Sequence, residues 1–256
     1  MKEMIGWLKT MIKVENIDIF GWEAAIRGMR NPMNSWERSD SEFGCEVVTG
    51  SYKFCNECSY RSDWCKNPQE YIIGPSDHEL MMKLAKGGPV HAKYRRMIHV
   101  QMDITAPLYW WKEFDTYKVG TVANSCSTMH KIHEKQFALG DFSHDRLLSL
   151  SVVDDLSRTV ASLNTWRNIY LNWDLYKDRD ELKSYTKKDI WYQMIQLLPS
   201  SYNQKRTVDL SYETLYSIYK WRKNHKLDEW VDFCKELEKL PYSEIFTLEW
   251  DYVKEN

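Results

Sequence analysis

The 256-residue sequence lacks the features that mark membrane proteins and exported proteins. It contains no apolar run of about 18 residues, the length needed to cross a bilayer. Lys2, Lys9 and Lys13 interrupt the apolar residues of the first stretch, and no small-residue cleavage site follows them, so no signal peptide is expected. We therefore expect a cytoplasmic protein without a membrane partner.

An excess of positive charge is also absent. Thirty-five Lys and Arg residues stand against 37 Asp and Glu residues, which leaves a formal net charge of −2. No overall positive field is available to hold a nucleic-acid backbone. A nucleic-acid polymer is therefore not an expected partner.

Several common catalytic motifs are missing as well. The sequence has no Gly-x-Ser-x-Gly elbow, no Walker loop and no Gly-x-Gly-x-x-Gly fingerprint. His130 and His133 are three residues apart, but no Glu-x-x-His pair accompanies them, so a catalytic metal is not expected. These absences argue against the common hydrolase, P-loop and dinucleotide-binding folds.

Four of the six cysteines lie close together, at Cys45, Cys55, Cys58 and Cys65. Without an export signal, reduced thiols are expected rather than disulfides. The Cys55–Cys58 spacing allows two thiolates to share a tetrahedral zinc, but the flanking intervals match no familiar four-cysteine finger. Ordinary loop cysteines are therefore favoured over a structural zinc, which stays open.

Aromatic residues are abundant, with 12 Trp and 16 Tyr. Their rings can fill a core or stack on a planar ligand. Because hydrophobic residues make up 43% and charged residues 28%, the composition is that of a folded protein. No internal repeat or low-complexity linker divides the chain, so a single domain spanning residues 1–256 is expected.

Hydrophobic periodicity predicts a mixed α+β chain. Apolar steps of three and four residues predict helices, and alternation predicts a half-buried strand. Residues 34–75 are rich in Ser, Gly, Asn and Cys and should form loops with one short strand at 46–49. Helices are expected over 16–30, 108–114, 154–174, 212–221 and 227–240. A further helix is expected to be capped by Asp77 and to end at Gly87-Gly88. A strand is expected over 93–105 and a loop over 121–129.

The densest cluster of reactive and polar side chains spans residues 106–118 and 124–131. Its aromatic rings, hydroxyls, amide and lysines could together bind a base, a sugar and a phosphate. On composition alone the structural alternative is favoured. Aromatic residues at helical spacing commonly fill a core, and a Ser/Thr/Asn string commonly caps a loop.

Taken in order, these pieces resemble the flavin-dependent thymidylate synthases from about residue 77 to 235. Gly88 and His91 are similar to the family's Gly and Glu-His opening, and Ala106-Pro107 to its Ala-Pro. In the first half of the resemblance, Lys112-Glu113 stands where the family has Arg-Gln, Thr116-Tyr117-Lys118 where it has Arg-His-Arg, and Met129-His130 where it has Arg-Tyr, while Thr121, Asn124 and Ser127 are similar to its Ser, Asn and second Ser. In the second half, Leu198-Pro199 resembles the family's Leu-Pro, with Ile195 in place of the Arg before it. Ser211 and Ser217 stand where the family has two Asn, and Trp221-Arg222 resembles its Leu-Arg.

The resemblance implies a thymidylate synthase-complementing type of α+β fold, with an antiparallel or mixed sheet and flanking helices. It implies a nucleotide site shared between subunits of a homotetramer, FAD as the cofactor, and Ser127 and Lys118 as catalytic residues. The implied nucleotide and cofactor-binding residues are His91, Lys112, Glu113, Tyr117, Lys118, Asn124, Ser125, Ser127, Ser211, Ser217 and Arg222.

The departures from the family pattern leave two functions open. Lysine and threonine cannot reproduce the bidentate contacts of arginine with phosphate. The chain is therefore expected to be either a flavin-dependent transferase acting on a deoxyuridine nucleotide or a non-catalytic protein that binds a nucleotide or cyclic nucleotide. A structural protein whose pocket is filled by side chains is a third interpretation.

Overall fold

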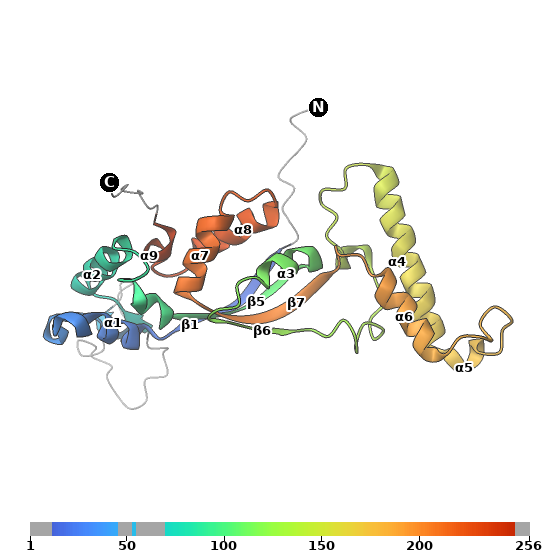
Figure 1. Cartoon of the computed structure of the whole chain (residues 1–256), viewed down its shortest axis with the longest axis horizontal. Helices are drawn as coiled ribbons and strands as arrows, with labels where there is room; N and C mark the ends of the chain where they lie inside the picture. The colour runs from blue at the N-terminus through green and yellow to red at the C-terminus, as the bar shows by residue number, and fades with distance from the viewer. Residues whose placement is uncertain (1–11, 46–52, 55–69, 249–256) are drawn as a thin grey trace.

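The computed structural model describes residues 12–45, 53–54 and 70–248. It confirms the expected fold class, because helices flank an antiparallel sheet (Figure 1). The larger sheet has the strand order β1-β5-β7-β6, and the smaller one has the order β3-β2-β4. The strands are β1 (Lys13–Phe20), β2 (Glu42–Cys45), β3 (Lys53–Phe54), β4 (Glu70–Ile72), β5 (His99–Pro107), β6 (Thr121–Ser125) and β7 (Asn203–Ser211).

The helices are interspersed with these strands along the chain. The α-helices are α1 (Trp22–Arg30), α2 (Pro75–Lys86), α3 (Leu108–Phe114), α4 (Leu150–Leu171), α5 (Trp173–Tyr176), α6 (Lys187–Leu197), α7 (Tyr212–Arg222), α8 (Asp228–Leu237) and α9 (Glu244–Thr247). Short 3-10 helices are η1 (Asn31–Met33), η2 (Trp36–Arg38), η4 (Lys93–Arg96) and η5 (Leu139–Asp141).

Strand β5 forms the centre of the larger sheet with β7. Val100, Met102 and Ile104 are buried, whereas His99 and Gln101 alternate with them on the other face. This two-residue period is the pattern expected of a strand with one covered face. The covered face packs against α3, α7 and α8, which lie on one side of the sheet in Figure 1.

Buried side chains form two separate hydrophobic clusters. The larger one joins the sheet to α1, α2, α3, α7 and α8 and includes Trp110, Trp111 and Trp230. The smaller one lies between α4 and α6, beyond the end of the sheet, and includes Leu163 and Met194 (Figure 1). The abundant aromatic residues thus serve largely as core.

Three expected elements differ from the structure. The helix predicted over 16–30 is a strand up to Phe20 and a helix only from Trp22. Gly21 separates them with a φ of 93°, a left-handed conformation that glycine adopts readily. The loop predicted over 121–129 begins with strand β6, and the strand predicted over 93–105 begins only at His99, after the 3-10 helix η4. In addition, β7 and α6 were not predicted.

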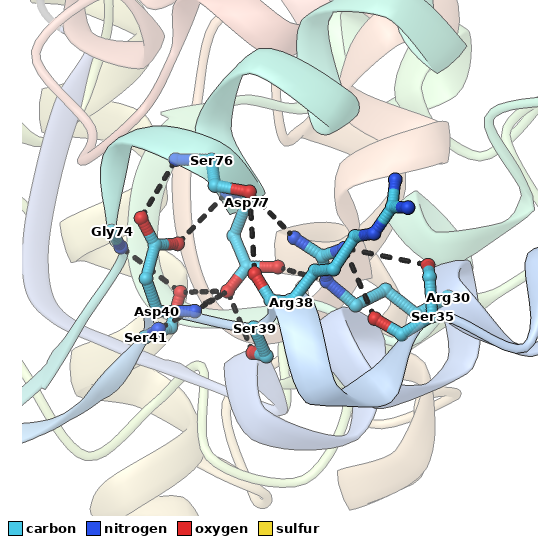
Figure 2. Close-up of polar contacts among 9 residues, drawn as sticks. All are labelled: Arg30, Ser35, Arg38, Ser39, Asp40, Ser41, Gly74, Ser76 and Asp77. Carbon is cyan, nitrogen blue, oxygen red and sulfur yellow. Dashed lines mark hydrogen bonds and ion pairs between the residues drawn. The ribbon is translucent and has the colours of Figure 1, made fainter.

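Asp77 does not cap α2 as the sequence analysis expected. It lies inside the helix, 0% exposed, and its carboxylate accepts a hydrogen bond from Arg30 Nε at 2.6 Å (Figure 2). The α2 start is capped instead by Asp40, which accepts hydrogen bonds from the backbone N–H groups of Ser76 and Asp77. These contacts fasten residues 35–41 to α1 and α2.

Three of the four clustered cysteines, Cys55, Cys58 and Cys65, which left a structural zinc open, lie outside the described residues, as does the strand predicted at 46–49. Within the described ranges no group of three or more His, Cys, Asp or Glu residues is placed to hold a metal, so zinc gains no support. No helix in the described part of the chain is both long and apolar enough to span a membrane.

Candidate functional site

Strand β6 positions the polar residues that the sequence analysis singled out. Asn124 pairs with Thr207 and Ser125 with Arg206 at the sheet edge, and both side chains are exposed. The backbone N–H of Cys126 donates to the Lys205 carbonyl at 2.9 Å, which extends the pairing by one residue. The segment that follows is therefore held at a fixed place beside the sheet.

Ser127 fixes the turn that comes next. Its hydroxyl oxygen accepts a hydrogen bond from the backbone N–H of His130 at 2.9 Å. A serine that bonds to a backbone N–H three residues later stabilises such a turn. The turn presents Met129 and His130 to a cavity.

This cavity, which we call the His–Lys pocket, has a volume of about 340 Å³. It opens between the turn after β6, the C-terminal half of α4 and the first turns of α6. Its lining residues are Met129, His130, His133, Tyr170, Lys187, Lys188 and Trp191. The volume falls within the range of small-molecule sites.

Packing and hydrogen bonds hold the walls of the His–Lys pocket in place. Trp191 Nε1 donates to the Met129 carbonyl at 2.9 Å, which ties α6 to the turn. The rings of His133 and Tyr170 lie 4.8 Å apart, and Lys187 Nζ lies 4.9 Å from the centre of the Tyr170 ring. The pocket therefore has aromatic walls with cationic groups beside them.

The electrostatics of the His–Lys pocket favour an anion. Two lysines and two histidines line it, and the described lining includes no carboxylate. Lys187 and Lys188 open α6, where the helix dipole adds positive potential. His133 Nδ1 is buried without a hydrogen-bond partner in the described part of the chain, and such a group normally has one.

A second group of predicted residues lies on α3, in the turn after α3 and on α7. These helices lie over one face of the larger sheet, whereas α6 lies beyond the end of the sheet (Figure 1). Arg222 donates from Nε to the Tyr117 hydroxyl at 3.0 Å and from Nη1 to Glu113 at 2.7 Å. Its guanidinium also lies 4.8 Å from the centre of the Trp230 ring. Arg222 is thus partly buried in an internal ion pair.

The remaining predicted residues take varied places. Lys112 and Lys118 are exposed, and His91 is exposed in the turn after α2. Ser211 caps α7 by accepting the Thr214 backbone N–H at 3.2 Å, and Ser217 is half-buried on α7. The structure therefore brings Glu113, Tyr117 and Arg222 together, and it does not place them in the His–Lys pocket.

The sequence analysis missed His133, Tyr170, Lys187, Lys188 and Trp191 as site residues. A usable signal was present at the start of α6, where Thr186 and Asp189 form a capping box. This motif would have predicted a helix opening with two lysines. Nothing in the sequence brings that helix to residues 129–133.

No family model matches the sequence, and no curated protein matches it. Solved structures do match in fold. The flavin-dependent thymidylate synthase ThyX from Helicobacter pylori, complexed with FAD and dUMP, gives a TM-score of 0.58 at 16% identity, over 93% of this chain and 98% of that chain. A second structure of ThyX from Helicobacter pylori with FAD and dUMP gives 0.56 at 15% identity, over 94% and 98%.

A related enzyme matches as well. The UMP/dUMP methylase PolB from Streptomyces cacaoi, bound with 5-Br dUMP, gives a TM-score of 0.51 at 12% identity, over 89% of this chain and 88% of that chain. At these identities the likeness establishes the fold. The chain has a ThyX-type fold, as the resemblance implied.

Proposed function

We propose that this chain binds a phosphorylated pyrimidine nucleotide in the His–Lys pocket. The observation that carries the proposal is the combination of cationic groups and aromatic rings around one cavity. Lys187, Lys188 and His130 would hold the phosphate, and Trp191 or Tyr170 would stack on the base. The ThyX and PolB structures are described with dUMP and 5-Br dUMP, which supports this ligand class.

A second copy of the chain would complete the site. Glu113, Tyr117 and Arg222 lie apart from the His–Lys pocket within one chain, so they reach a ligand in it only from a neighbouring copy. The homotetramer implied by the family resemblance would supply that neighbour. In this arrangement Lys118 lies on the incoming copy. Asn124, Ser125 and Ser127 do not line the pocket but lie in the strand and turn that lead to Met129 and His130.

Thr116, Tyr117 and Lys118 occupy the positions of the family's Arg-His-Arg triplet. Their side chains do not fit a flavin diphosphate as the family's arginines do. Thr116 Oγ1 donates to the Glu113 carbonyl, and the Tyr117 hydroxyl accepts from Arg222. Only Lys118 of the three offers an exposed cation. This favours nucleotide binding without flavin chemistry, and FAD binding and transferase activity stay predictions.

Calorimetric titration with dUMP and with deoxyuridine tests the proposal. We expect dUMP to bind and deoxyuridine to bind far more weakly, because only dUMP carries the phosphate. Lys187→Ala should weaken dUMP binding by about ten- to a hundredfold, since a charged hydrogen bond contributes about 1.5–3 kcal/mol. Lys183→Ala is the matched control, because Lys183 pairs with Asp180 at the surface.

Equal binding of dUMP and deoxyuridine would contradict the proposal. So would a Lys187→Ala variant that binds dUMP as tightly as Lys183→Ala. A thermal shift offers an independent measurement, since a ligand at about 100 times its Kd adds roughly 2.7 kcal/mol of stability. Adding FAD in a parallel titration shows whether flavin binds at all.

A further inference from the structure

A second cavity shares no lining residue with the His–Lys pocket. It has a volume of about 870 Å³ and opens between β1, the start of α1, the smaller sheet and the turn at Pro241-Tyr242. Five aromatic residues line it, and we call it the aromatic cleft: Phe20, Trp22, Phe43, Tyr71 and Tyr242. Its size suits a small organic ligand.

Two edge-to-face ring pairs line the aromatic cleft. Phe43 and Tyr71, from β2 and β4, have ring centres 5.1 Å apart. Trp22 and Tyr242 have ring centres 5.3 Å apart. Phe20 and Phe43 are 42% and 43% exposed, and the Phe20 ring stacks on His99 with ring centres 5.6 Å apart, so both rings are partly accessible to a ligand. Exposed rings that are held in place by edge contacts can stack on a planar molecule.

Tyr242 is held in an unfavourable backbone conformation. Its φ is 53°, in the left-handed region that a bulky side chain rarely adopts. Its hydroxyl accepts the backbone N–H of Ile73 at 3.1 Å, which links the turn to the end of β4. Strain of this kind persists where surrounding contacts fix it, and it concentrates at ligand sites.

The charge of the aromatic cleft is opposite to that of the His–Lys pocket. The charged residues among its described lining are Asp18 and Glu23, both acidic. Burial, together with the nearby carboxylates of Asp77 and Glu23, raises the pKa of Tyr71 to about 12, so its hydroxyl stays neutral and can donate. A phosphate would be repelled here.

We propose that the aromatic cleft binds a planar aromatic cation. Carboxylates and the faces of aromatic rings both attract positive charge, and a flat ring can stack on the exposed aromatic side chains of the cleft. The ligand therefore differs in charge from the nucleotide proposed for the His–Lys pocket. The two sites lie on different elements and should bind independently.

Fluorescence titration with proflavine, a planar cation, tests this inference. We expect saturable one-to-one binding, and at least tenfold weaker binding of acridine-9-carboxylate, which has a similar ring but a negative charge. Phe43→Ala should weaken proflavine binding roughly tenfold because it removes one ring of the wall. Asp18→Asn should weaken it severalfold, whereas Asp178→Asn, an exposed acid near α5, should have no effect.

Several results would overturn the inference: no saturation by proflavine, equal binding of the acridine carboxylate, or a Phe43→Ala variant that binds proflavine like the unaltered protein. Circular dichroism shows whether Phe43→Ala is folded, and the Asp18→Asn variant keeps the test valid if it is not. Lys187→Ala should leave proflavine binding unchanged, which separates this site from the His–Lys pocket.

Discussion

Asp77 connects three segments of the chain through one carboxylate. Its Oδ1 accepts from Arg30 Nε, while its Oδ2 accepts from the Ser39 and Ser41 hydroxyls and from the backbone N–H groups of Asp40 and Ser41 (Figure 2). Both Arg30 and Asp77 are buried. Because a buried charge requires partners, the loss of this carboxylate would leave Arg30 uncompensated.

We therefore predict that Asp77→Asn lowers the free energy of unfolding by about 3 kcal/mol at neutral pH. Urea denaturation measures the change. Asp178→Asn serves as the control and should change the free energy by less than about 0.5 kcal/mol, because that carboxylate is exposed. An equal effect of both substitutions would show that the Arg30–Asp77 pair contributes nothing particular.

The same pair has a defined dependence on pH. Burial alone would raise the pKa of Asp77, but hydrogen bonds from Ser41, Ser39 and Arg30, with the charge of Arg30, hold it below its ordinary value. A lowered folded-state pKa contributes stability above the unfolded-state pKa and loses it as pH falls. The difference between the unaltered protein and Asp77→Asn should be constant at neutral pH and shrink below about pH 4.

Among the elements, α6 matters most for the His–Lys pocket. Thr186 accepts the Asp189 backbone N–H at 3.2 Å, and Asp189 accepts the Thr186 backbone N–H at 2.7 Å. This capping box fixes the helix start that carries Lys187 and Lys188. The geometry of the cations in the pocket therefore depends on a motif that does not line it.

We predict that Thr186→Ala lowers the free energy of unfolding by about 1 kcal/mol and also weakens dUMP binding. Chemical denaturation and calorimetry measure the two effects. Ser157→Ala on α4 is the control, because the Ser157 hydroxyl only bonds back to the Val153 carbonyl within its own helix. Loss of stability with unchanged dUMP affinity would mean that the helix start does not position the lysines.

The elements also show what periodicity could and could not predict. The alternation in β5 and the apolar spacing in α3, α4 and α7 are long or strong enough to be recognised from sequence. Strands β1 and β6 lie at the edges of the sheet, where partial exposure removes the alternating pattern. Strand β7 was not recognised from the sequence, because Arg, Thr and Asp are mixed with its apolar residues.

Only the part of the proposed site that consecutive residues form could be predicted from the sequence. Ser127 and the turn to His130 are local and were expected as part of a site. The His–Lys pocket joins residues 129–133, 170 and 187–191, and only the packing of α4 on α6 brings these together. The internal pairing of Arg222 with Glu113 is a long-range contact of the same kind.

At the scale of the whole molecule, the two hydrophobic clusters separate two halves of the expected site. The His–Lys pocket belongs to the α4–α6 end, and Arg222 belongs to the helices over the sheet (Figure 1). Within one chain Arg222 does not line the His–Lys pocket. Association of copies would bring them together, and the tetramer stays a prediction.

The most direct measurement is the anomalous diffraction of crystals grown with 5-bromo-dUMP, because the bromine atom marks the position of the base. We predict an anomalous peak inside the His–Lys pocket, in contact with Trp191 or Tyr170, with the phosphate beside Lys187 or Lys188. A second copy should bring its Glu113, Tyr117 and Arg222 side chains to the ligand. A nucleotide bound elsewhere in the molecule would contradict the proposed site. So would the absence of any bromine peak in crystals grown at saturating ligand.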